Sequence, residues 1–390
     1  MDFTMPEDVK QIQMLTKRFV RQELVPIEDL VEQRDEYPED IRRPLIKRSI
    51  ELGIRNMETP VKFGGGGVGA LGVVAAHEEA GWSSEAVTYS IMRPGPGAST
   101  AFMEAATEQQ RQKYMYPVLR GEREGCAAWT EPDAGGDAAS IKARAVKKGK
   151  HWVLNGVKHF CTNADKSDFV IVGAATDPGK PPRERFTQFI IDFGTPGLQL
   201  SFYQPMMGRH GLKSFELVLE NCEVPAENVL GEVGSALRRT LTNFGHGRLL
   251  MAARFVGTAE RALEMATSYA KRRVTFGQPI ASRQAVQWML VDMAIDIHAT
   301  RMMTYHAAWQ ADQELDHRAL QFTQAMVKLH ASQMVCRVVD NAIQIHGGIG
   351  YSRLLPLERM YRDVRLYRIA EGPDEMMKHV IARYILQAEA

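Results

Sequence analysis

The spacing of apolar residues divides the chain into three stretches. Residues 1–122 are helix-like, with glycine- and proline-rich breaks at 64–67 and 94–97 of the kind that separate helices. From about Gly234 onward the pattern is helical again, and several long helices without strands predict a bundle. One core-facing stripe with i, i+3, i+4, i+7, i+8 spacing consists of Val335, Val338, Val339, Ala342 and Ile343.

The pattern changes to strands near Cys126. Three apolar or alternating runs of strand length cover 169–175, 186–193 and 215–224. Asn155-Gly156 lies between two apolar runs and suits a type I′ turn, so it predicts a β-hairpin. We therefore expect the middle of the chain to form a small β domain.

Composition narrows the classes of protein. The 390 residues are 45% hydrophobic, enough for a large core in two or three lobes. The net charge is +1 with both signs interspersed, so we expect no nucleic-acid partner, because such binders present a basic face. The N-terminus lacks a basic segment followed by an apolar one, and no apolar run reaches about 18 residues. A cytoplasmic protein without a membrane span is predicted.

The cysteines and histidines predict no metal site. Cys126, Cys161, Cys222 and Cys336 are far apart, without a C-x-x-C pair, and the chain has no H-E-x-x-H. This pattern fits free thiols in a reducing compartment.

One carboxylate stands out near the C-terminus. Glu371 lies between Ala370 and the pair Gly372-Pro373, where a helix must break. Its side chain can therefore project into a cavity as a general base. An exposed loop glutamate is the alternative on spacing alone.

Two long segments resemble signatures of the acyl-CoA dehydrogenase family. One of them runs from Ala128 to Ser140 (AWTEPDAGGDAAS) and is similar to the family segment T-E-P-x-A-G-S-D. The resemblance covers essentially the whole chain and implies an α-helical domain (1–123), a β-barrel-like domain (124–232) and a four-helix bundle (233–390). The other signature lies near the C-terminus and comprises Gln344, Gly347, Gly348, Gly350, Tyr351, Pro356, Arg362, Asp363, Glu371 and Gly372.

The resemblance implies FAD as the cofactor, with binding residues in two groups. Those expected beside the flavin ring are Ala127, Trp129, Thr130, Gly136 (usually Ser in the family), Phe160, Thr162, Pro373 and Glu375. In the second group, Arg273 is expected to neutralise the FAD pyrophosphate of a neighbouring subunit, and further FAD contacts are expected from Thr275, Phe276, Gln284, Gln344, Gly347 and Gly348. Shared cofactor sites imply a homo-oligomer, by family precedent a tetramer.

The resemblance also implies the reaction. Glu371 removes the α-proton of an acyl-CoA thioester while hydride passes from the β-carbon to flavin N5, and an electron-transfer flavoprotein accepts the electrons. A minority branch carries its base at the position of Gly247, which has no carboxylate. Glu131 is a competitor whose T-E-P context looks structural. The alternatives are a flavin oxidase or monooxygenase using O2, and a non-catalytic helical adaptor.

Residues expected to border the substrate are Gly136, Gly247, Arg248, Ala370 and Gly372. Ala370 stands where straight-chain enzymes commonly have Tyr, so a branched, aromatic or otherwise bulky acyl group is expected. Arg93 lies in the Pro/Gly-rich loop. It pairs with a polar or carboxylate end of the substrate or, alternatively, is a solvated loop arginine.

Overall fold

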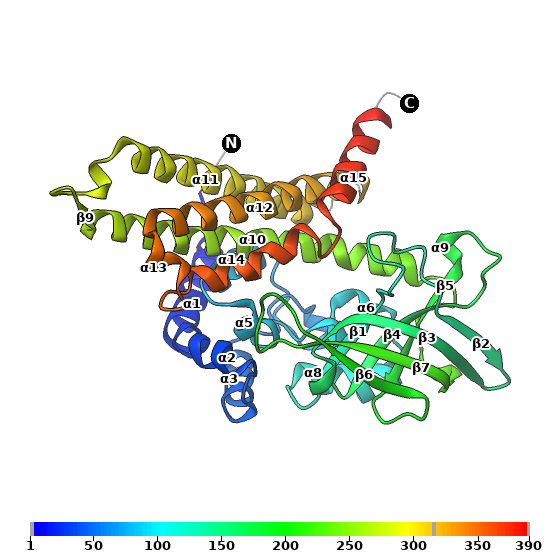
Figure 1. The fold of residues 1–390 in the computed structure, drawn as a ribbon. Coiled ribbons are helices and arrows are strands. Elements are labelled where there is room, and N and C mark those ends of the chain that lie inside the picture. Colours follow the sequence, from blue (N-terminus) through cyan, green and yellow to red (C-terminus); the bar gives the residue numbers. More distant parts are fainter. Residues whose placement is uncertain (1–3, 314–316, 388–390) are drawn as a thin grey trace.

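The computed structural model describes residues 4–313 and 317–387, and it confirms the order of helical, sheet and helical domains (Figure 1). In the N-terminal domain, α4 packs against both α1 and the long helix α10 of the C-terminal domain. The N-terminal helices are α1 (Glu7–Phe19), α2 (Glu28–Arg34), α3 (Glu39–Glu51), α4 (Ala70–Ala80), α5 (Glu85–Met92), α6 (Thr100–Ala105), α7 (Glu108–Gln110) and α8 (Tyr116–Leu119).

The middle domain is built on one twisted sheet. Its strand order is β6-β7-β3-β2-β4-β5-β8, with β1 paired in parallel to β4. The three strand-length runs predicted from the sequence are confirmed as β4, β5 and β7. The elements are β1 (Gly125–Ala128), β2 (Arg144–Lys148), β3 (His151–Thr162), β4 (Phe169–Ala175), α9 (Pro182–Arg185), β5 (Phe186–Asp192), β6 (Leu198–Gln204), β7 (Ser214–Pro225) and β8 (Val229–Leu230).

The predicted hairpin at Asn155-Gly156 is wrong. Both residues lie inside β3, and the turn that joins β2 to β3 is at Gly149-Lys150. Gly156 is needed for close packing rather than for a turn, because a methyl group there would lie 2.6 Å from the Cβ of Ala143. Asn155 Oδ1 accepts a hydrogen bond from the backbone N–H of Asn221 at 2.8 Å, at a β-bulge between β3 and β7.

Three long helices, α10, α11 and α12, pack on one another in the C-terminal domain, and α14 and α15 pack against α12 (Figure 1). The stripe predicted for Val335 to Ile343 lies in α12 and packs in the core. None of the helices in the described part of the chain is long and apolar enough to cross a membrane. The elements are α10 (Ala236–Arg272), β9 (Val274–Thr275), β10 (Gln278–Pro279), α11 (Gln284–Asp312), α12 (His317–His346), α13 (Gly348–Tyr351), α14 (Leu357–Arg365) and α15 (Asp374–Gln387).

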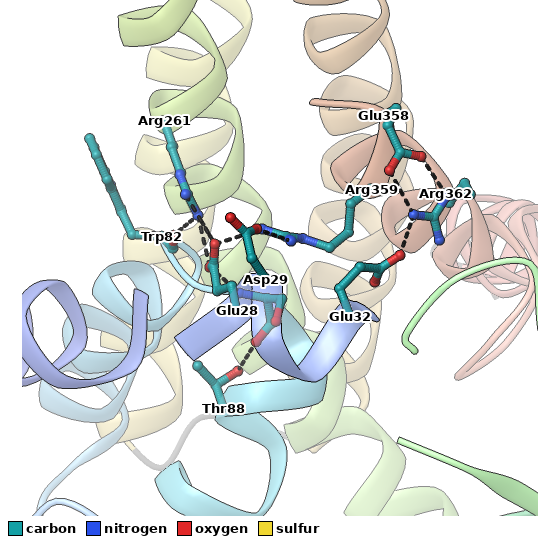
Figure 2. A network of polar contacts seen from close by, with 10 residues as sticks. Glu28, Asp29, Glu32, Trp82, Thr88, Arg261, Glu358, Arg359 and Arg362 are labelled. Atoms are coloured by element: carbon teal, nitrogen blue, oxygen red, sulfur yellow. Dashed lines mark hydrogen bonds and ion pairs between the residues drawn. The ribbon is translucent and has the colours of Figure 1, made fainter. Parts of the chain in front are cut away.

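A buried carboxylate joins the N-terminal domain to the bundle. Glu28, on α2, is 2% exposed and accepts hydrogen bonds from Arg261 of α10 and Arg359 of α14 (Figure 2). The backbone N–H of Ser84 also donates to Glu28, at 2.7 Å. Both carboxylate oxygens are therefore occupied, and this contact holds α2, α10 and α14 in one arrangement.

Candidate active site

The turn that carries Glu371 has a constrained backbone. Glu371 has φ 55° and Gly372 has φ 99°, both in the left-handed region. For a residue with a side chain this conformation costs about 1–2 kcal/mol. Two side chains from the bundle hold it in place. Arg248 Nε donates to the Glu371 carbonyl at 3.0 Å, and Lys328 Nζ donates to the Gly372 carbonyl at 2.6 Å.

The Glu371 carboxylate is free to take up a proton. No described residue donates a hydrogen bond to it, and burial raises the pKa of Glu371, although the charges of Arg248 and Arg93 oppose the rise. A methyl group at Gly247 would lie 3.7 Å from Glu371 Oε2, so the carboxylate faces this position of α10. A half-buried carboxylate with a raised pKa suits a general base.

Lys328 was not among the residues chosen from the sequence. It is fully buried on α12, and its Nζ lies 3.8 Å from Asp374 Oδ1. Burial lowers the pKa of Lys328 to about 8. The available signal was a charged residue on the core stripe, seven positions before Val335. Asp374 is fixed in turn by Ser332, Gln333 and Arg368.

Glu131, the competing carboxylate, is occupied by structural contacts. It accepts hydrogen bonds from the backbone N–H groups of Lys142 and Ala143 at 2.6 and 3.0 Å. Its third partner is the fully buried Lys158, whose Nζ lies 2.6 Å away. These contacts fix the loop after β1 and leave Glu131 unsuited to proton transfer.

The flavin-side residues of the middle domain lie together. The N–H of His159 donates to the Thr130 carbonyl at 2.8 Å, so the end of β1 lies beside β3. Phe160, with φ 54°, is 52% exposed and offers an open aromatic face, with Thr162 two residues on. Ala127 lies in β1, which among the described strands pairs with β4 alone. An exposed aromatic ring beside backbone groups and hydroxyls fits the isoalloxazine of FAD.

The Trp129 side chain has a structural place. Its Nε1 donates to the Ala138 carbonyl at 2.9 Å, and its ring packs on Gly173, where a methyl group would lie 2.3 Å from ring carbon Cε3. Only the backbone of Trp129 therefore remains for the cofactor.

A cleft of about 550 Å³ opens beside the Glu371 turn. Gly136 lies at its inner wall, where a methyl group would be 3.4 Å from Pro373 and Met376. Ala370 packs half-buried against the core, and Glu375 is exposed at the start of α15. The cleft is lined by Gly136, Arg248 and Gly372 at this end and by the basic residues Arg183, Arg318 and Arg383.

The second predicted cofactor group lies at the other end of α10 (Figure 1). Arg273 follows α10, and Arg248 and Arg273 are about 37 Å apart along a helix that rises about 1.5 Å per residue. The second group therefore lies far from the Glu371 turn of the same chain, which Arg248 contacts. This end is exposed at Arg273, Phe276, Gln284, Gln344, Gly347 and Gly348, while Thr275 is half-buried.

A tight hairpin shapes that far end. Strands β9 and β10 are joined by Phe276-Gly277, with φ of 50° and 78°, as in a type I′ turn. The Phe276 side chain is 98% exposed. An aromatic ring held away from its own chain is available to a neighbouring molecule.

Arg93 is not a solvated loop arginine. It follows α5, its side chain is 27% exposed, and its Nη2 donates to Glu58 Oε1 at 3.0 Å. Glu58 Oε2 lies 3.0 Å from His246 Nε2 of α10, one residue before Gly247. No local pattern predicts the contact between Glu58 and His246, because they are 188 positions apart along the chain.

Comparison with known proteins gives relatives of the same length. The chain is 35% identical to (R)-benzylsuccinyl-CoA dehydrogenase of Thauera aromatica, over 99% of this chain and 97% of that protein. It is 34% identical to an acyl-CoA dehydrogenase of Bacillus subtilis, over 95% and 96%. It is 33% identical to caffeyl-CoA reductase-Etf complex subunit CarC of Acetobacterium woodii, over 98% and 99%.

Solved structures and family models agree with these relatives. Butyryl-CoA dehydrogenase of Megasphaera elsdenii superposes with a TM-score of 0.89 at 32% identity, covering 99% of this chain and 100% of that one. The FAD complex of PigA superposes with a TM-score of 0.92 at 26% identity over the full length of both chains. Models of the acyl-CoA dehydrogenase N-terminal, middle and C-terminal domains match residues 6–122, 126–222 and 235–386. The chain therefore belongs to the acyl-CoA dehydrogenase family of FAD-dependent oxidoreductases, as its two signatures predicted.

Proposed function

We propose that this enzyme catalyses α,β-dehydrogenation of an acyl-CoA thioester, with Glu371 as the base that removes the α-proton. One observation carries the proposal. The carboxylate of Glu371 has no hydrogen-bond donor among the described residues, has a raised pKa and lies on a left-handed turn beside a cleft. A carboxylate arranged in this way is prepared to accept a proton from a bound ligand.

The same turn provides donors for the thioester carbonyl. The backbone N–H groups of Glu371 and Gly372 have no hydrogen-bond partner among the described residues. Donors aimed at a carbonyl oxygen stabilise the negative charge that develops there as the α-proton leaves. Arg248 and Lys328 donate to the carbonyls of the turn, and its two N–H groups remain available to a ligand. Bound FAD would supply the hydride acceptor, held by Ala127, Trp129 backbone, Thr130, Phe160 and Thr162.

The cleft supports binding of a CoA thioester. Gly136, Arg248 and Gly372 line it next to the Glu371 turn, where the pantetheine chain would lie. Glycine at 136, in place of the usual serine, leaves only a backbone N–H for contact. A second hollow of about 530 Å³ shares Arg183 with the cleft and is lined also by Lys180 and Arg238. Guanidinium and ammonium groups at the outer end suit the phosphates of CoA.

The acyl group is proposed to be branched, aromatic or otherwise bulky. Ala370 has a small side chain next to the base, which leaves room beside the reacting carbons. The similarity to a dehydrogenase named for benzylsuccinyl-CoA, at 35% identity, supports a bulky substrate.

We also propose a homo-oligomer, by family precedent a tetramer, and an electron-transfer flavoprotein as electron acceptor. Exposure of the second cofactor group at the far end of α10 supports sharing of cofactor sites between subunits. The name of the CarC relative, a subunit of a complex with Etf, supports the acceptor.

The test is an anaerobic titration of the purified FAD enzyme with straight-chain, branched, aromatic and dicarboxyl-derived acyl-CoA thioesters. We expect one class to bleach the flavin band. A band that no thioester bleaches would contradict the proposal. Rapid oxygen consumption by the reduced enzyme would favour an oxidase instead.

A further inference from the structure

The segment that follows β1 has two successive backbone carbonyls anchored on β3. Lys158 Nζ donates to the Trp129 carbonyl at 3.0 Å, and the backbone N–H of His159 donates to the Thr130 carbonyl at 2.8 Å. Lys158 and His159 are neighbours on β3, so they hold both carbonyls at one place along that strand. We call residues 129–131 the flavin loop, because Thr130 is expected to contact the flavin ring.

Lys158 occupies a position that suits an apolar side chain. It is fully buried, and in the register of the sheet it lies opposite Leu217 of β7, which is also fully buried. Taking an ammonium group out of water is costly, and a buried ion pair is often no more stabilising than apolar side chains of the same volume. Stability alone therefore does not explain a lysine at this position.

Both hydrogen-bond acceptors of Lys158 lie in the flavin loop. Besides the Trp129 carbonyl, its Nζ donates to Glu131 Oε1 at 2.6 Å. The Glu131 carboxylate is itself buried and accepts from two backbone N–H groups before β2. The pair of Lys158 and Glu131 is neutral as a whole, so it brings no net charge to the site. Its contribution is to fix the backbone on both sides of Thr130.

Thr130 itself keeps two donors available. Its carbonyl accepts from His159, whereas its backbone N–H and its hydroxyl have no hydrogen-bond partner among the described residues. The residue is half-buried, so these donors are partly shielded from solvent. Two polar groups on one fixed residue suit the heteroatoms of a flat ring such as the isoalloxazine of FAD.

The same stretch of β3 presents the aromatic face that is expected to stack on the ring. Phe160 directly follows His159, has φ 54° and is about half exposed. Its backbone N–H donates to Gln204 Oε1 at 2.8 Å, which anchors this part of β3 to the end of β6. Three successive residues of β3 therefore fix the donors of Thr130 and this aromatic face relative to one another.

We propose that Lys158 is a positioning residue of the cofactor site, which holds the flavin loop so that the N–H and hydroxyl of Thr130 meet the ring of bound FAD. Hydrogen bonds to the ring heteroatoms set how strongly a flavin holds electrons, and preorganised donors act without rearrangement as charge develops. Lys158 thus raises the affinity of the protein for FAD and the reduction potential of the bound flavin, without touching the cofactor. This inference goes beyond the proposed function, because it concerns the cofactor and is tested without a thioester.

The experiment measures the midpoint potential of the flavin in the Lys158→Met enzyme, by anaerobic reductive titration beside a reference dye of known potential. Methionine fills a similar volume but cannot donate to the Trp129 carbonyl or to Glu131. The equilibrium between reduced and oxidised flavin should move about tenfold toward the oxidised form, which is about 30 mV for a two-electron couple. The dissociation constant of FAD, measured on the apoprotein, should rise about tenfold, because the loop must then be ordered on binding.

A double variant separates the effect of position from the effect of charge. Lys158→Met alone leaves the buried Glu131 without its counter-ion, and this negative charge would by itself disfavour the reduced flavin. Combining Lys158→Met with Glu131→Gln removes both charges and still leaves the Trp129 carbonyl without its donor. We expect the double variant to keep the lowered potential, and it carries the test if the single variant fails to fold. A double variant with the wild-type potential would overturn the inference.

Two controls separate positioning from a loss of stability. Lys142→Met removes a lysine close to the flavin loop, but this side chain is 73% exposed and pairs with Asp133, so the potential and the FAD affinity should not change. Glu28→Gln breaks a buried ion pair elsewhere (Figure 2) and should lower the unfolding temperature at an unchanged potential. If Lys158→Met were likewise less stable but kept the wild-type potential and FAD affinity, Lys158 would be structural only and the inference would fail.

Discussion

Glu28 and Glu371 are both glutamates set among arginines of the same bundle, yet their environments differ in one respect. Glu28 receives hydrogen bonds at its two oxygens from Arg261 and Arg359 (Figure 2) and from the Ser84 N–H. The arginine nearest to Glu371, Arg248, donates instead to its backbone carbonyl. The arginines therefore donate to the carboxylate itself at Glu28, but to the backbone of the turn at Glu371.

This difference separates a structural carboxylate from a reactive one. Hydrogen bonds to both oxygens hold Glu28 in one position between three helices. At Glu371 the backbone is fixed, while no described residue donates a hydrogen bond to the carboxylate. The carboxylate can therefore accept a proton from a ligand. Each of the following predictions tests this difference between Glu28 and Glu371.

Glu371→Gln should have the largest effect. The amide keeps the shape of the side chain but cannot take a proton, so substrate-driven flavin reduction should fall by about a thousandfold. The FAD spectrum and the unfolding temperature should change little. Stopped-flow absorbance under anaerobic conditions measures the rate. A variant that reduced its flavin at the wild-type rate would show that another group is the base.

Glu28→Gln should reverse the pattern, with a loss of stability and little change in rate. It leaves Arg261 and Arg359 buried without a counter-charge at this position, which should cost about 3 kcal/mol. Denaturant or thermal unfolding of the FAD enzyme measures the loss. Glu122→Gln is the matched control, because its ion pair with Arg120 is about half exposed and should contribute little to stability. Equal stability losses in the two variants would contradict the structural role of Glu28.

Lys328→Met tests the support beneath the turn. It removes the donor to the Gly372 carbonyl and leaves that carbonyl without its partner, at a cost of about 1–3 kcal/mol. If the loss of this hydrogen bond displaces Glu371, flavin reduction at saturating substrate should slow by tenfold to a hundredfold. The apparent dissociation constant of the substrate should change little. Lys142→Met, at a side chain that is 73% exposed, is the control. An unchanged rate would mean that Arg248 alone fixes the turn.

The dependence of stability and rate on pH should show the smallest effect, but it reports directly on the Glu371 carboxylate. Because the folded pKa of Glu371 is raised above the usual 4.5, the folded state binds its proton more tightly than the unfolded chain does. Protonated Glu371 therefore favours folding, and this contribution is lost as pH rises through the folded pKa. Glu371→Gln should gain stability relative to wild type as pH rises through that range, measured by unfolding temperatures. The rate of wild-type flavin reduction should fall as pH drops through the same range.

Local chemistry made part of this site predictable. Glu371 was identified because Glu-Gly-Pro breaks a helix, and the family signatures gave the fold, the flavin and the order of domains. Strand-length apolar runs gave β4, β5 and β7, because side-chain alternation and burial are written in the sequence. The prediction at Asn155-Gly156 is wrong because an Asn-Gly pair suits a hairpin turn and also suits a strand in which the glycine must pack closely. Here Gly156 packs against Ala143 inside β3.

The rest depends on contacts between distant segments. Glu58 meets His246 across 188 positions, and Lys328 supports Gly372 across 44. Neither side chain has a local pattern that names its partner.

The length of α10 has a genetic consequence. Because it places Arg273 about 37 Å from Arg248, which contacts the Glu371 turn, each complete site in the proposed oligomer would combine the flavin-side group of one subunit with the Arg273 group of another. Two inactive variants, one altered at Phe160 and one at Arg273, would then repair each other when co-expressed. Random pairing would restore about a quarter of the sites. Alleles altered in the two different cofactor groups would thus complement each other, whereas two alleles altered in the same group would not.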